Sequence, residues 1–333
     1  MLTDAIDRVA RGRDLAADEA ARVLREVMEG NASEAETAAF LIGLRTKGET
    51  VQEIAGLAAT MRELALPVRA RGDLVDTAGT GGGRPTFNVS TTAAFIAAGA
   101  GCRVAKHGNR SATSQCGSAD VLEALGARID LEPGEVAACI EEIGFGFMFA
   151  PKHHSAMRHV VPVRKALGVR TIFNFLGPLT NPAGAKRQVI GVSDPARIET
   201  LALALAELGT ESALVVSSAD GLDELSVSGT TRVVELKDGR LGVYDVSPEQ
   251  VGLEPAPDGA VAAGTPGQNA RVLRDVLGGP PGTERSLAIF NAGAAIYVGG
   301  LADSLVAGVE RAHEAIDSGA AAAVLDAYVE RAQ

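Results

Sequence analysis

With 333 residues, a net charge of −11 and a pI of about 5.0, the chain lacks the basic surplus that nonspecific binding to nucleic acid requires. Hydrophobic residues make up 46% of it, yet its longest apolar run, residues 93–101, is far short of the roughly 20 residues that span a bilayer. These values exclude a disordered chain and a membrane-spanning one, and they predict a globular α/β protein large enough for two unequal units.

The first 66 residues carry the pattern of amphipathic helices. Ser33 with Glu36 and Thr50 with Glu53 have the spacing of a capping box, in which two side chains satisfy free N–H groups at a helix start. Apolar residues follow each box at helical intervals, first as Phe40, Leu41 and Leu44 and then as Ile54, Leu57, Met61 and Leu64. The pattern predicts a helical unit that Pro67 ends.

We place this helical domain at residues 1–70, joined by helices from about 155–180, and an α/β domain that binds the ligand at residues 71–333. A unit this small with so many apolar stripes buries them partly on the larger domain and partly on a second copy of the chain. The sequence therefore predicts a homodimer formed through the helical domain.

From residue 74 onward, short β runs alternate with Gly-rich turns and Ala-rich helices, which is typical of parallel strands with crossover helices. The predicted strands are residues 74–76, 103–105, 145–149, 188–192, 213–216 and 232–236. Asp238-Gly239 is a hairpin signal and predicts an antiparallel part of the sheet, whereas the stretch 248–267 predicts an irregular loop. The expected fold class is α/β, with a small N-terminal helical domain and a large domain around a central, mostly parallel sheet.

The three cysteines, Cys102, Cys116 and Cys139, lack the paired spacing of a metal site and leave an odd thiol in any disulfide scheme. The N-terminus has no basic region followed by an apolar core, as a secretory signal would have. These features predict that the cysteines are packing residues and that the protein is cytoplasmic.

A glycine-rich stretch follows the first predicted strand. It runs Asp76-Thr-Ala-Gly79-Thr-Gly-Gly-Gly83 and continues as Thr86-Phe-Asn-Val-Ser-Thr-Thr92 into an Ala-rich helix. Glycines let the backbone approach a ligand with its N–H groups turned inward, and a helix N-terminus favours negative charge. The stretch predicts a diphosphate cradle, because it has neither the Gly-Lys-Ser/Thr of a P-loop nor the Rossmann fingerprint. A tight strand-to-helix turn without a ligand is the alternative.

Polar and cationic residues follow the second predicted strand as Lys106-His-Gly-Asn-Arg-Ser111, and continue to Gly117-Ser-Ala-Asp120. They emerge at the carboxyl end of the sheet, where open α/β folds bind ligands. A solvated loop is the alternative, and His107 by itself is more typical of a structural histidine. Residues 76–118 hold four basic residues and one acid, a charge of +3 against −14 for the remainder, so we expect a local anion site.

In combination these motifs resemble the anthranilate phosphoribosyltransferase family, through Gly-Thr-Gly-Gly before Asn-Val-Ser-Thr, then Lys-His-Gly-Asn-Arg-Ser, then Gly-Ser-Ala-Asp-Val-Leu-Glu-Ala-Leu-Gly. The resemblance covers nearly the whole chain and includes Pro151-Lys-His-His154, Val-Arg164-Lys-Ala-Leu-Gly-Val-Arg-Thr-Ile-Phe-Asn, Leu176-Gly-Pro-Leu-Thr-Asn-Pro182 and Gly221-Leu-Asp-Glu224. Single pieces recur in nucleoside phosphorylases of similar fold. The resemblance implies an enzyme of tryptophan biosynthesis that transfers the 5-phosphoribosyl group of phosphoribosyl diphosphate (PRPP) to anthranilate, giving N-(5-phosphoribosyl)anthranilate and diphosphate.

The resemblance also implies a role for each matching position. For PRPP binding it implies Gly79, Gly82, Gly83, Thr86, Asn88, Val89, Ser90, Thr91, Lys106, His107, Gly108, Asn109, Arg110, Ser111, Ala112, Thr113, Ser114 and Ser118. For anthranilate it implies Gly79, His107, Asn109, His154, Arg164, Gly177 and Pro178. For Mg2+, with two ions in each subunit, it implies Ser90, Asp223 and Glu224. Lys106 is expected to act electrostatically, and no dedicated catalytic base is expected.

The side-chain chemistry of several positions supports these roles. Arg164 can form a bidentate pair with the carboxylate of anthranilate, which a neutral pyrimidine does not offer. Asn109 can accept a hydrogen bond from the aromatic amine. Asp223 and Glu224 offer the oxygen ligands that Mg2+ prefers, although an acidic pair by itself is more often plain surface.

One position departs from the family pattern, because Gly83 stands where the family commonly has Asp and Arg84-Pro85 follow in a shortened loop. The diphosphate site thereby loses a negative charge and gains a positive one, which predicts a changed Mg2+ dependence. Two alternative functions remain. A pyrimidine nucleoside phosphorylase is disfavoured by Arg164 and by the acidic pair Asp223-Glu224, and a noncatalytic nucleic-acid-binding relative is disfavoured by the low pI.

Overall fold

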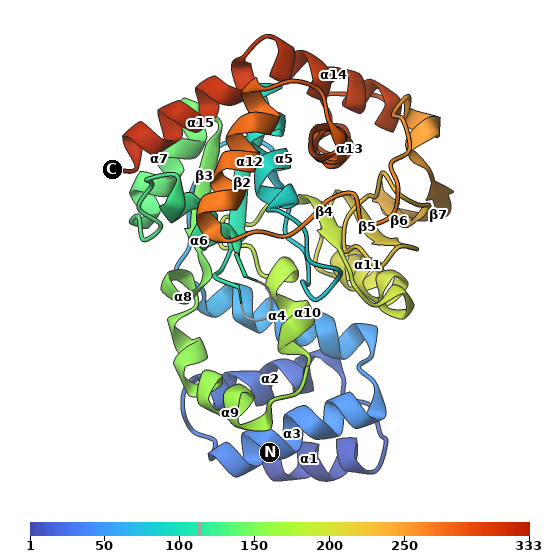
Figure 1. Cartoon of the computed structure of the whole chain (residues 1–333). Helices are drawn as coiled ribbons and strands as arrows, with labels where there is room; N and C mark the ends of the chain where they lie inside the picture. The colour runs from blue at the N-terminus through green and yellow to red at the C-terminus, as the bar shows by residue number, and fades with distance from the viewer. Residues whose placement is uncertain (112–114) are drawn as a thin grey trace.

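The computed structural model describes residues 1–111 and 115–333 and consists of a helical unit beneath a larger α/β unit in the view of Figure 1. The helical unit begins with α1 (Leu2–Ala10), α2 (Ala17–Met28), α3 (Glu34–Lys47) and α4 (Val51–Leu64). A later segment returns to it with α8 (Ala150–His153), α9 (Val161–Leu167) and α10 (Phe173–Leu176), and with short 3-10 turns at Ser155–His159 and Gly177–Leu179. In this segment α9 packs on α3, and α10 packs on α4.

Both predicted capping boxes are present at the helix starts. The Ser33 hydroxyl accepts the N–H of Glu36 at 3.2 Å, and the Glu36 carboxylate accepts the N–H of Ser33 at 3.0 Å. Thr50 and Glu53 make the same exchange at the start of α4. Glu53 is fully buried and also accepts the N–H of Leu15 at 3.0 Å. This one carboxylate therefore fixes the connection between α1 and α2 against α4.

The α/β unit is built on a seven-stranded sheet with the order β3-β2-β1-β4-β5-β6-β7. Five strands are parallel, namely β1 (Leu74–Asp76), β2 (Arg103–Gly108), β3 (Phe145–Phe149), β4 (Arg187–Gly191) and β5 (Ser212–Ser218). The last two are antiparallel, namely β6 (Thr231–Lys237) and β7 (Arg240–Val246). The helical domain, the α/β domain and the mostly parallel sheet are thus confirmed. Because the strand order reverses at β1, a ligand crevice is expected beyond its carboxyl end.

Strand β7 was missed by the sequence pattern. Asp238 (φ 51°) and Gly239 (φ 73°) form the predicted two-residue hairpin turn, since both adopt the left-handed conformation that such turns require. The strand after this turn lies at the sheet edge with Leu241 and Val243 exposed, so it lacks the alternating burial that marks a strand in sequence. The predicted irregular loop after β7 contains a short 3-10 turn at Pro248–Val251.

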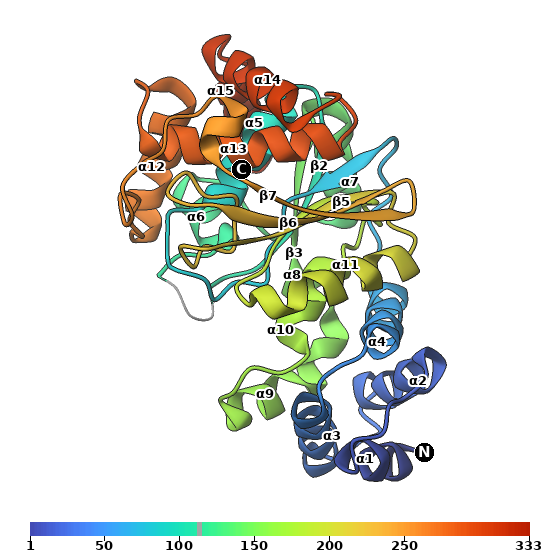
Figure 2. The ribbon, with the colours of Figure 1, turned by 90° about the vertical axis from the view of Figure 1, so that its right-hand side faces the viewer.

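Helices cover both faces of the sheet, as Figure 2 shows. One face carries α5 (Val89–Gly99), α12 (Pro266–Gly278), α13 (Thr283–Val298), α14 (Leu305–Asp317) and α15 (Ala320–Arg331). On this side α6 packs on α12 and α7 packs on α15, with α6 at Ser118–Ala124 and α7 at Pro133–Ile143. The other face carries α11 (Ile198–Glu207), preceded by a 3-10 turn at Pro195–Arg197, and beyond it the helical unit.

Two buried apolar clusters correspond to the two faces. One joins α5, α13 and α15 to the upper face of the sheet. The other begins in α1 to α4 and continues through α11 to Ile190, Val215 and Val234 of the sheet, so the helical unit shares a core with the α/β unit. Within the described ranges, no helix combines the length and the apolar character needed to cross a membrane.

Candidate active site

A cavity of about 710 Å³ opens at the carboxyl ends of the parallel strands and is also lined by residues of α9 and α10. Loops from several strands meet there because parallel strands end on the same edge of a sheet. Most of the residues singled out in the sequence line it, namely Gly79, Gly82, Gly83, Thr86, Asn88, Val89, Ser90, Lys106, His107, Asn109, Arg110, Ser111, Ser118, Arg164, Gly177, Pro178, Asp223 and Glu224. Segments far apart in the chain thus contribute to one site.

Three of the singled-out residues lie behind this lining. The Thr91 hydroxyl donates to the Ser118 hydroxyl at 3.1 Å and thereby supports a residue that does line the cavity. Gly108 ends β2 against the Phe147 ring, where a Cβ atom would not fit. The ring of His154 packs against that of His107, with 5.1 Å between their centres. Ala112, Thr113 and Ser114 lie outside the described residues.

The glycine loop (residues 79–83) connects β1 to α5 without regular structure. Gly81 and Gly82 have φ values of 67° and 85°, which residues with side chains rarely adopt. A Cβ atom at Gly83 would collide with Oδ1 of Asp223. The lack of side chains therefore lets this loop lie directly against Asp223, to which the backbone N–H groups of Gly81 and Gly83 are hydrogen-bonded, while the N–H of Thr80 donates to the carbonyl of Gly191 at 2.8 Å.

Helix α5 begins at Val89, at the predicted position beside the cavity, but the Asn88 side chain does not cap it. The Asn88 amide donates to the carbonyl of Cys116 at 3.2 Å, and its Oδ1 accepts from Nδ2 of Asn269 at 2.9 Å. Asn88 therefore ties the loop before α6 to α12. Its side chain acts within this hydrogen-bond network, which the sequence pattern did not indicate.

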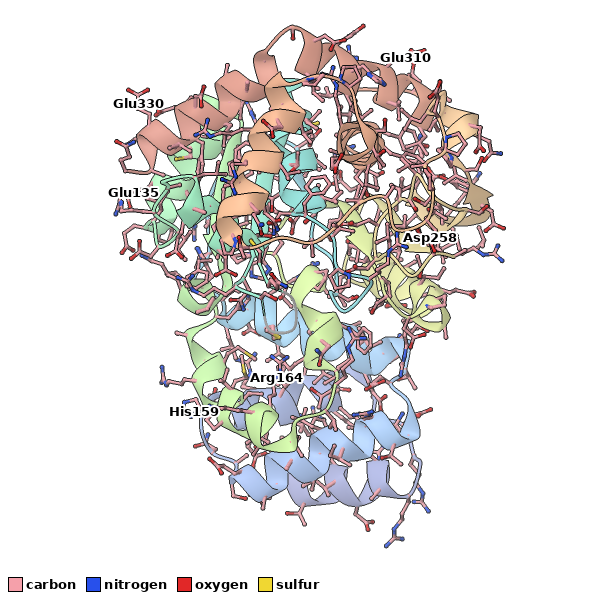
Figure 3. The ribbon with its side chains drawn as sticks, in the orientation of Figure 1. Glu135, His159, Arg164, Asp258, Glu310 and Glu330 are labelled. Carbon is pink, nitrogen blue, oxygen red and sulfur yellow. The ribbon has the colours of Figure 1, made fainter. Side chains whose placement is uncertain are left out.

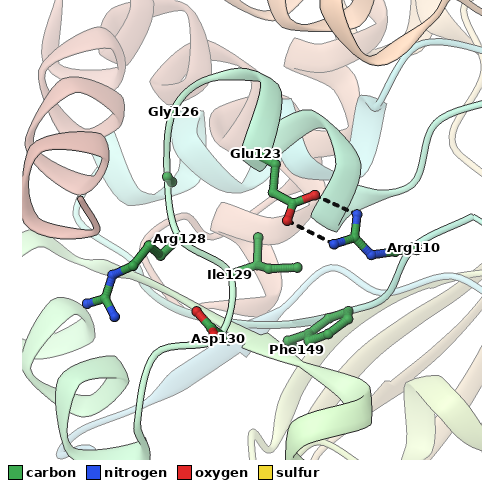
Figure 4. A pocket seen from close by; sticks show the side chains of 8 residues that line it. Arg110, Glu123, Gly126, Arg128, Ile129, Asp130 and Phe149 are labelled. Atoms are coloured by element: carbon green, nitrogen blue, oxygen red, sulfur yellow. Dashed lines mark hydrogen bonds and ion pairs between the residues drawn. The ribbon is translucent and has the colours of Figure 1, made fainter.

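Two arginines of the expected anion site are neutralised by carboxylates, which corrects the charge counted from the sequence. Arg84 pairs with Asp220 at 3.1 Å and with Asp258. Arg110 donates twice to the carboxylate of Glu123, at 2.5 and 2.8 Å, beside a second, smaller pocket whose lining residues Figure 4 shows. All three acids lie outside the window of residues 76–118, so the net positive charge at the cavity is smaller than the count of +3 suggested.

Lys106 remains as a buried cation, 1% exposed. Its ammonium donates to the carbonyl and hydroxyl oxygens of Thr77, at 2.8 and 3.1 Å, and to the hydroxyl of Ser90 at 3.3 Å. Burial lowers the pKa of Lys106 to about 8, against the attraction of Asp76 and Glu224, which raises it. Burial also raises the pKa of Asp76 to about 6, opposed by Lys106. Lys106 is thus a fixed positive charge at neutral pH, and the hydroxyl groups of Thr77 and Ser90 lie next to it.

The acidic pair, Asp223 and Glu224, faces the cavity from the loop after β5. Burial raises the pKa of both carboxyls, and repulsion by Asp223 raises that of Glu224 further. The next residue, Leu225, is held by Asn291 of α13, which accepts its N–H at 3.0 Å and donates to its carbonyl at 2.9 Å. Helix α13 therefore fixes the backbone that presents the pair.

These carboxylates fit a divalent cation. Two buried carboxylates with raised pKa values are stabilised by added positive charge, and Mg2+ takes oxygen ligands while sharing its shell with phosphate and water. Across residues 1–111 and 115–333, no cluster of three or more His, Cys, Asp or Glu side chains could enclose a metal. The protein thus supplies few direct ligands, as suits an ion that arrives with a phosphate-bearing substrate.

One side of the cavity is formed by Arg164, Phe173 and His107. Arg164, labelled in Figure 3, comes from α9 and has its guanidinium 5.5 Å from the centre of the Phe173 ring. Burial lowers its pKa, and within the described chain it forms no ion pair. A half-buried cation beside an aromatic ring can bind an aromatic carboxylate by pairing and stacking.

His107 stabilises the turn next to this arginine. Its Nδ1 lies 3.2 Å from the carbonyl of Gly177, which can only accept, so Nδ1 carries the proton. Burial lowers its pKa to about 3, so the ring is neutral at physiological pH. Oδ1 of Asn109 accepts the N–H of Arg110 at 2.7 Å and keeps a second lone pair for a donor in the cavity.

Outside the motifs at residues 76–92 and 106–120, sequence reasoning assigned no role to three polar residues of the cavity lining, Arg170, Asn174 and Asn291. Arg170 follows α9 in the same basic stretch as Arg164, and nothing in that pattern separates a cavity arginine from a surface one. Asn291 had a usable signal, because it is a lone amide in an otherwise apolar stretch of α13, and such a buried amide needs a partner.

Comparisons with known proteins agree with this geometry. Residues 3–65 match the helical bundle domain of a glycosyl transferase family, and residues 71–322 match its a/b domain. An anthranilate phosphoribosyltransferase of Rubrobacter xylanophilus is 54% identical over 99% of this chain and 97% of the relative. One from Symbiobacterium thermophilum is 52% identical over 96% of this chain and 94% of that relative.

Solved structures of the same kind superpose over the full length. The crystal structure of anthranilate phosphoribosyltransferase from Thermus thermophilus has a TM-score of 0.94 and 46% identity, covering 98% of this chain and 99% of that one. Anthranilate phosphoribosyltransferase from Saccharomyces cerevisiae, in complex with PRPP and Mg, has a TM-score of 0.90 and 27% identity, covering 99% and 97%.

Proposed function

The chain belongs to the anthranilate phosphoribosyltransferase family of glycosyl transferases, and we propose that it transfers the 5-phosphoribosyl group of PRPP to the amino group of anthranilate, in tryptophan biosynthesis. The products are N-(5-phosphoribosyl)anthranilate and diphosphate. The observation that carries this proposal is a single cavity lined by the glycine loop, Lys106, Arg164 and the acidic pair.

The donor half of the cavity suits PRPP. The glycine loop, the start of α5 and the buried ammonium of Lys106 border one space, and a helix start and a fixed cation both favour a bound anion. Ser90, Asn109, Ser111 and Ser118 add polar groups along the same wall. We place the diphosphate at the glycine loop and the ribose phosphate toward Ser118, and the other PRPP residues implied by the family resemblance form part of this proposal.

The acceptor half suits anthranilate. Arg164 pairs with the carboxylate, Phe173 packs on the ring, and the Gly177-Pro178 turn held by His107 closes the wall. The free lone pair of Asn109 accepts an N–H of the aromatic amine. His154 contributes by packing behind His107.

Cleavage of the bond between ribose C1 and diphosphate places positive charge on the sugar and negative charge on the leaving group. Lys106 and the start of α5 stabilise that leaving group, and one preorganised donor is worth roughly 3 kcal/mol. Arg164 and Asn109 hold the amine near C1, so that positioning lowers the remaining barrier. The neutral amine is the nucleophile, and no dedicated base is required.

Mg2+ completes the donor half, with Asp223, Glu224 and Ser90 as its proposed protein ligands and two ions in each subunit. When bound, it neutralises diphosphate charge. The raised carboxyl pKa values support this placement, because a cation relieves the repulsion within the acidic pair.

Oligomeric state, domain division and location complete the proposal. We propose a homodimer through the helical unit, supported by Met1 and Val161, which are 60% and 51% exposed there. The domain boundary lies near residue 70, and residues 155–180 join the helical domain. A cytoplasmic location is supported by Cys102 and Cys139, which are buried thiols that form no disulfide.

The test is a fluorescence assay of anthranilate consumption with PRPP and Mg2+, in which each component is left out in turn. Consumption is expected only when all three are present with the enzyme. A protein that is folded yet leaves anthranilate unchanged under the complete conditions would refute the proposed function.

A further inference from the structure

Arg170 lies in the connection between α9 and α10 and reaches into the cavity from a fixed position. Its own carbonyl accepts Nη1 of Arg45 from α3 at 2.8 Å. The N–H of the next residue, Thr171, donates to Oδ1 of Asn174 at 2.9 Å. The peptide group that follows Arg170 is therefore held through both its carbonyl and its N–H, so the side chain leaves the backbone from a defined point.

The guanidinium of Arg170 contacts the glycine loop. Its Nη2 donates to the carbonyl of Gly81 at 2.6 Å, and its Nη1 donates to the hydroxyl of Ser193 at 3.1 Å, which in turn donates to the same carbonyl at 3.0 Å. A Cβ atom at Gly82 would collide with the guanidinium. Arg170 therefore lies against the part of the loop that we assign to the diphosphate.

The positive charge of Arg170 is not consumed by these contacts. Both acceptors are neutral oxygens, and in the described part of the chain no carboxylate forms an ion pair with Arg170. A guanidinium has five N–H donors, so each terminal nitrogen keeps one more and Nε keeps its own. Arg84, which also lines the cavity, differs because Asp220 and Asp258 neutralise it.

We propose that Arg170 binds the departing diphosphate directly, as a second fixed cation beside Lys106. The inference rests on the proposed function and deepens it. Its remaining N–H groups match the paired oxygens of a phosphate, which arginine binds in bidentate form. Because Arg170 is anchored through Arg45 to the helical unit, it also links the segment that holds the acceptor to the loop that holds the donor.

The experiment compares Arg170→Met, Arg170→Lys and Ser193→Ala with the full-length wild-type enzyme. The inhibition constant of pyrophosphate against PRPP, the KM of each substrate, and pyrophosphate binding by calorimetry with Mg2+ but without anthranilate are measured. In Arg170→Met, the pyrophosphate constant and the KM of PRPP are expected to rise together by at least about tenfold, as for loss of a charged contact. The KM of anthranilate is expected to change less than about twofold.

The other variants separate charge from loop support. Arg170→Lys keeps the charge, so its pyrophosphate constant is expected to rise only about threefold. Ser193→Ala removes one partner of Gly81, and its pyrophosphate constant is expected to rise less than about threefold. Arg158→Met is the matched control for net charge, because it removes an exposed arginine from the 3-10 turn that precedes α9. An unchanged pyrophosphate constant in Arg170→Met would overturn the proposal, as would an equal loss in Ser193→Ala. Failure of the wild type to consume anthranilate would instead overturn the proposed function.

Discussion

Replacing Arg164 by methionine tests the acceptor half of the site most directly. The side chain is half-buried beside Phe173, its pKa is lowered by desolvation, and within the described residues no acid neutralises it. A carboxylate that binds there replaces water at a partly desolvated cation, and losing such a contact costs about 1.5 to 3 kcal/mol. Since about 1.4 kcal/mol is a factor of ten, the KM of anthranilate should rise roughly 10- to 150-fold.

The assay follows anthranilate fluorescence at saturating PRPP and Mg2+. Methionine keeps most of the stem and its packing on Phe173, so a larger KM reflects the missing charge rather than a void. Arg158→Met, an exposed neighbour in the preceding turn, controls for a change in net charge. The KM of PRPP should stay within about twofold in both variants.

A modified acceptor adds a second, independent comparison. 2-Aminobenzamide replaces the carboxylate of anthranilate by a neutral amide, so it should bind the wild type weakly and should lose little more in Arg164→Met. Substrate and protein changes that remove the same contact are not additive. If Arg164→Met left the KM of anthranilate unchanged, or weakened both acceptors equally, the carboxylate would not bind at Arg164.

Three further predictions concern the donor half. Gly83→Asp adds a third carboxylate next to Asp223 and Glu224 and should increase the Mg2+ dependence of the KM of PRPP. An unchanged Mg2+ titration would contradict this. Asn291→Leu leaves the N–H and carbonyl of Leu225 without their partner, which costs about 1 to 3 kcal/mol and should lower Tm by a few degrees. It should also raise the half-saturating Mg2+ concentration, and by more than the control Leu287→Ala on the same helix does. Lys106, with a pKa of about 8, loses its proton as pH rises through that value, so kcat/KM for PRPP should fall on the alkaline side, and a flat profile to about pH 9 would argue against its electrostatic role.

The order of strands and loops could be predicted because the decisive signals are local. The capping boxes at Ser33 and Thr50, the Asp238-Gly239 turn and the glycine run at residues 79–83 each fix the backbone within a few residues. Once parallel strands are recognised, their carboxyl ends must meet, which brings the motifs of two strands together without further information.

The charge distribution of the site could not be predicted in the same way. Arg84 is neutralised by Asp220 and Asp258, which follow it by 136 and 174 residues. A count of charges along the chain cannot include partners that only folding brings close. The same holds for Arg170, whose contacts to Gly81 and Ser193 join segments separated by 89 and 23 residues.

The core that continues from α4 through α11 into the sheet governs how the chain can be divided. A fragment starting near residue 70 would uncover the surface of α11 on which α4 packs, and the carbonyls of Leu179 and Leu208 would lose the guanidinium of Arg62. Neither piece would retain a closed interior, so the boundary between the two family modules does not separate units that fold independently. A protein that is truncated, circularly permuted or recombined at that point needs other side chains to cover this shared interior.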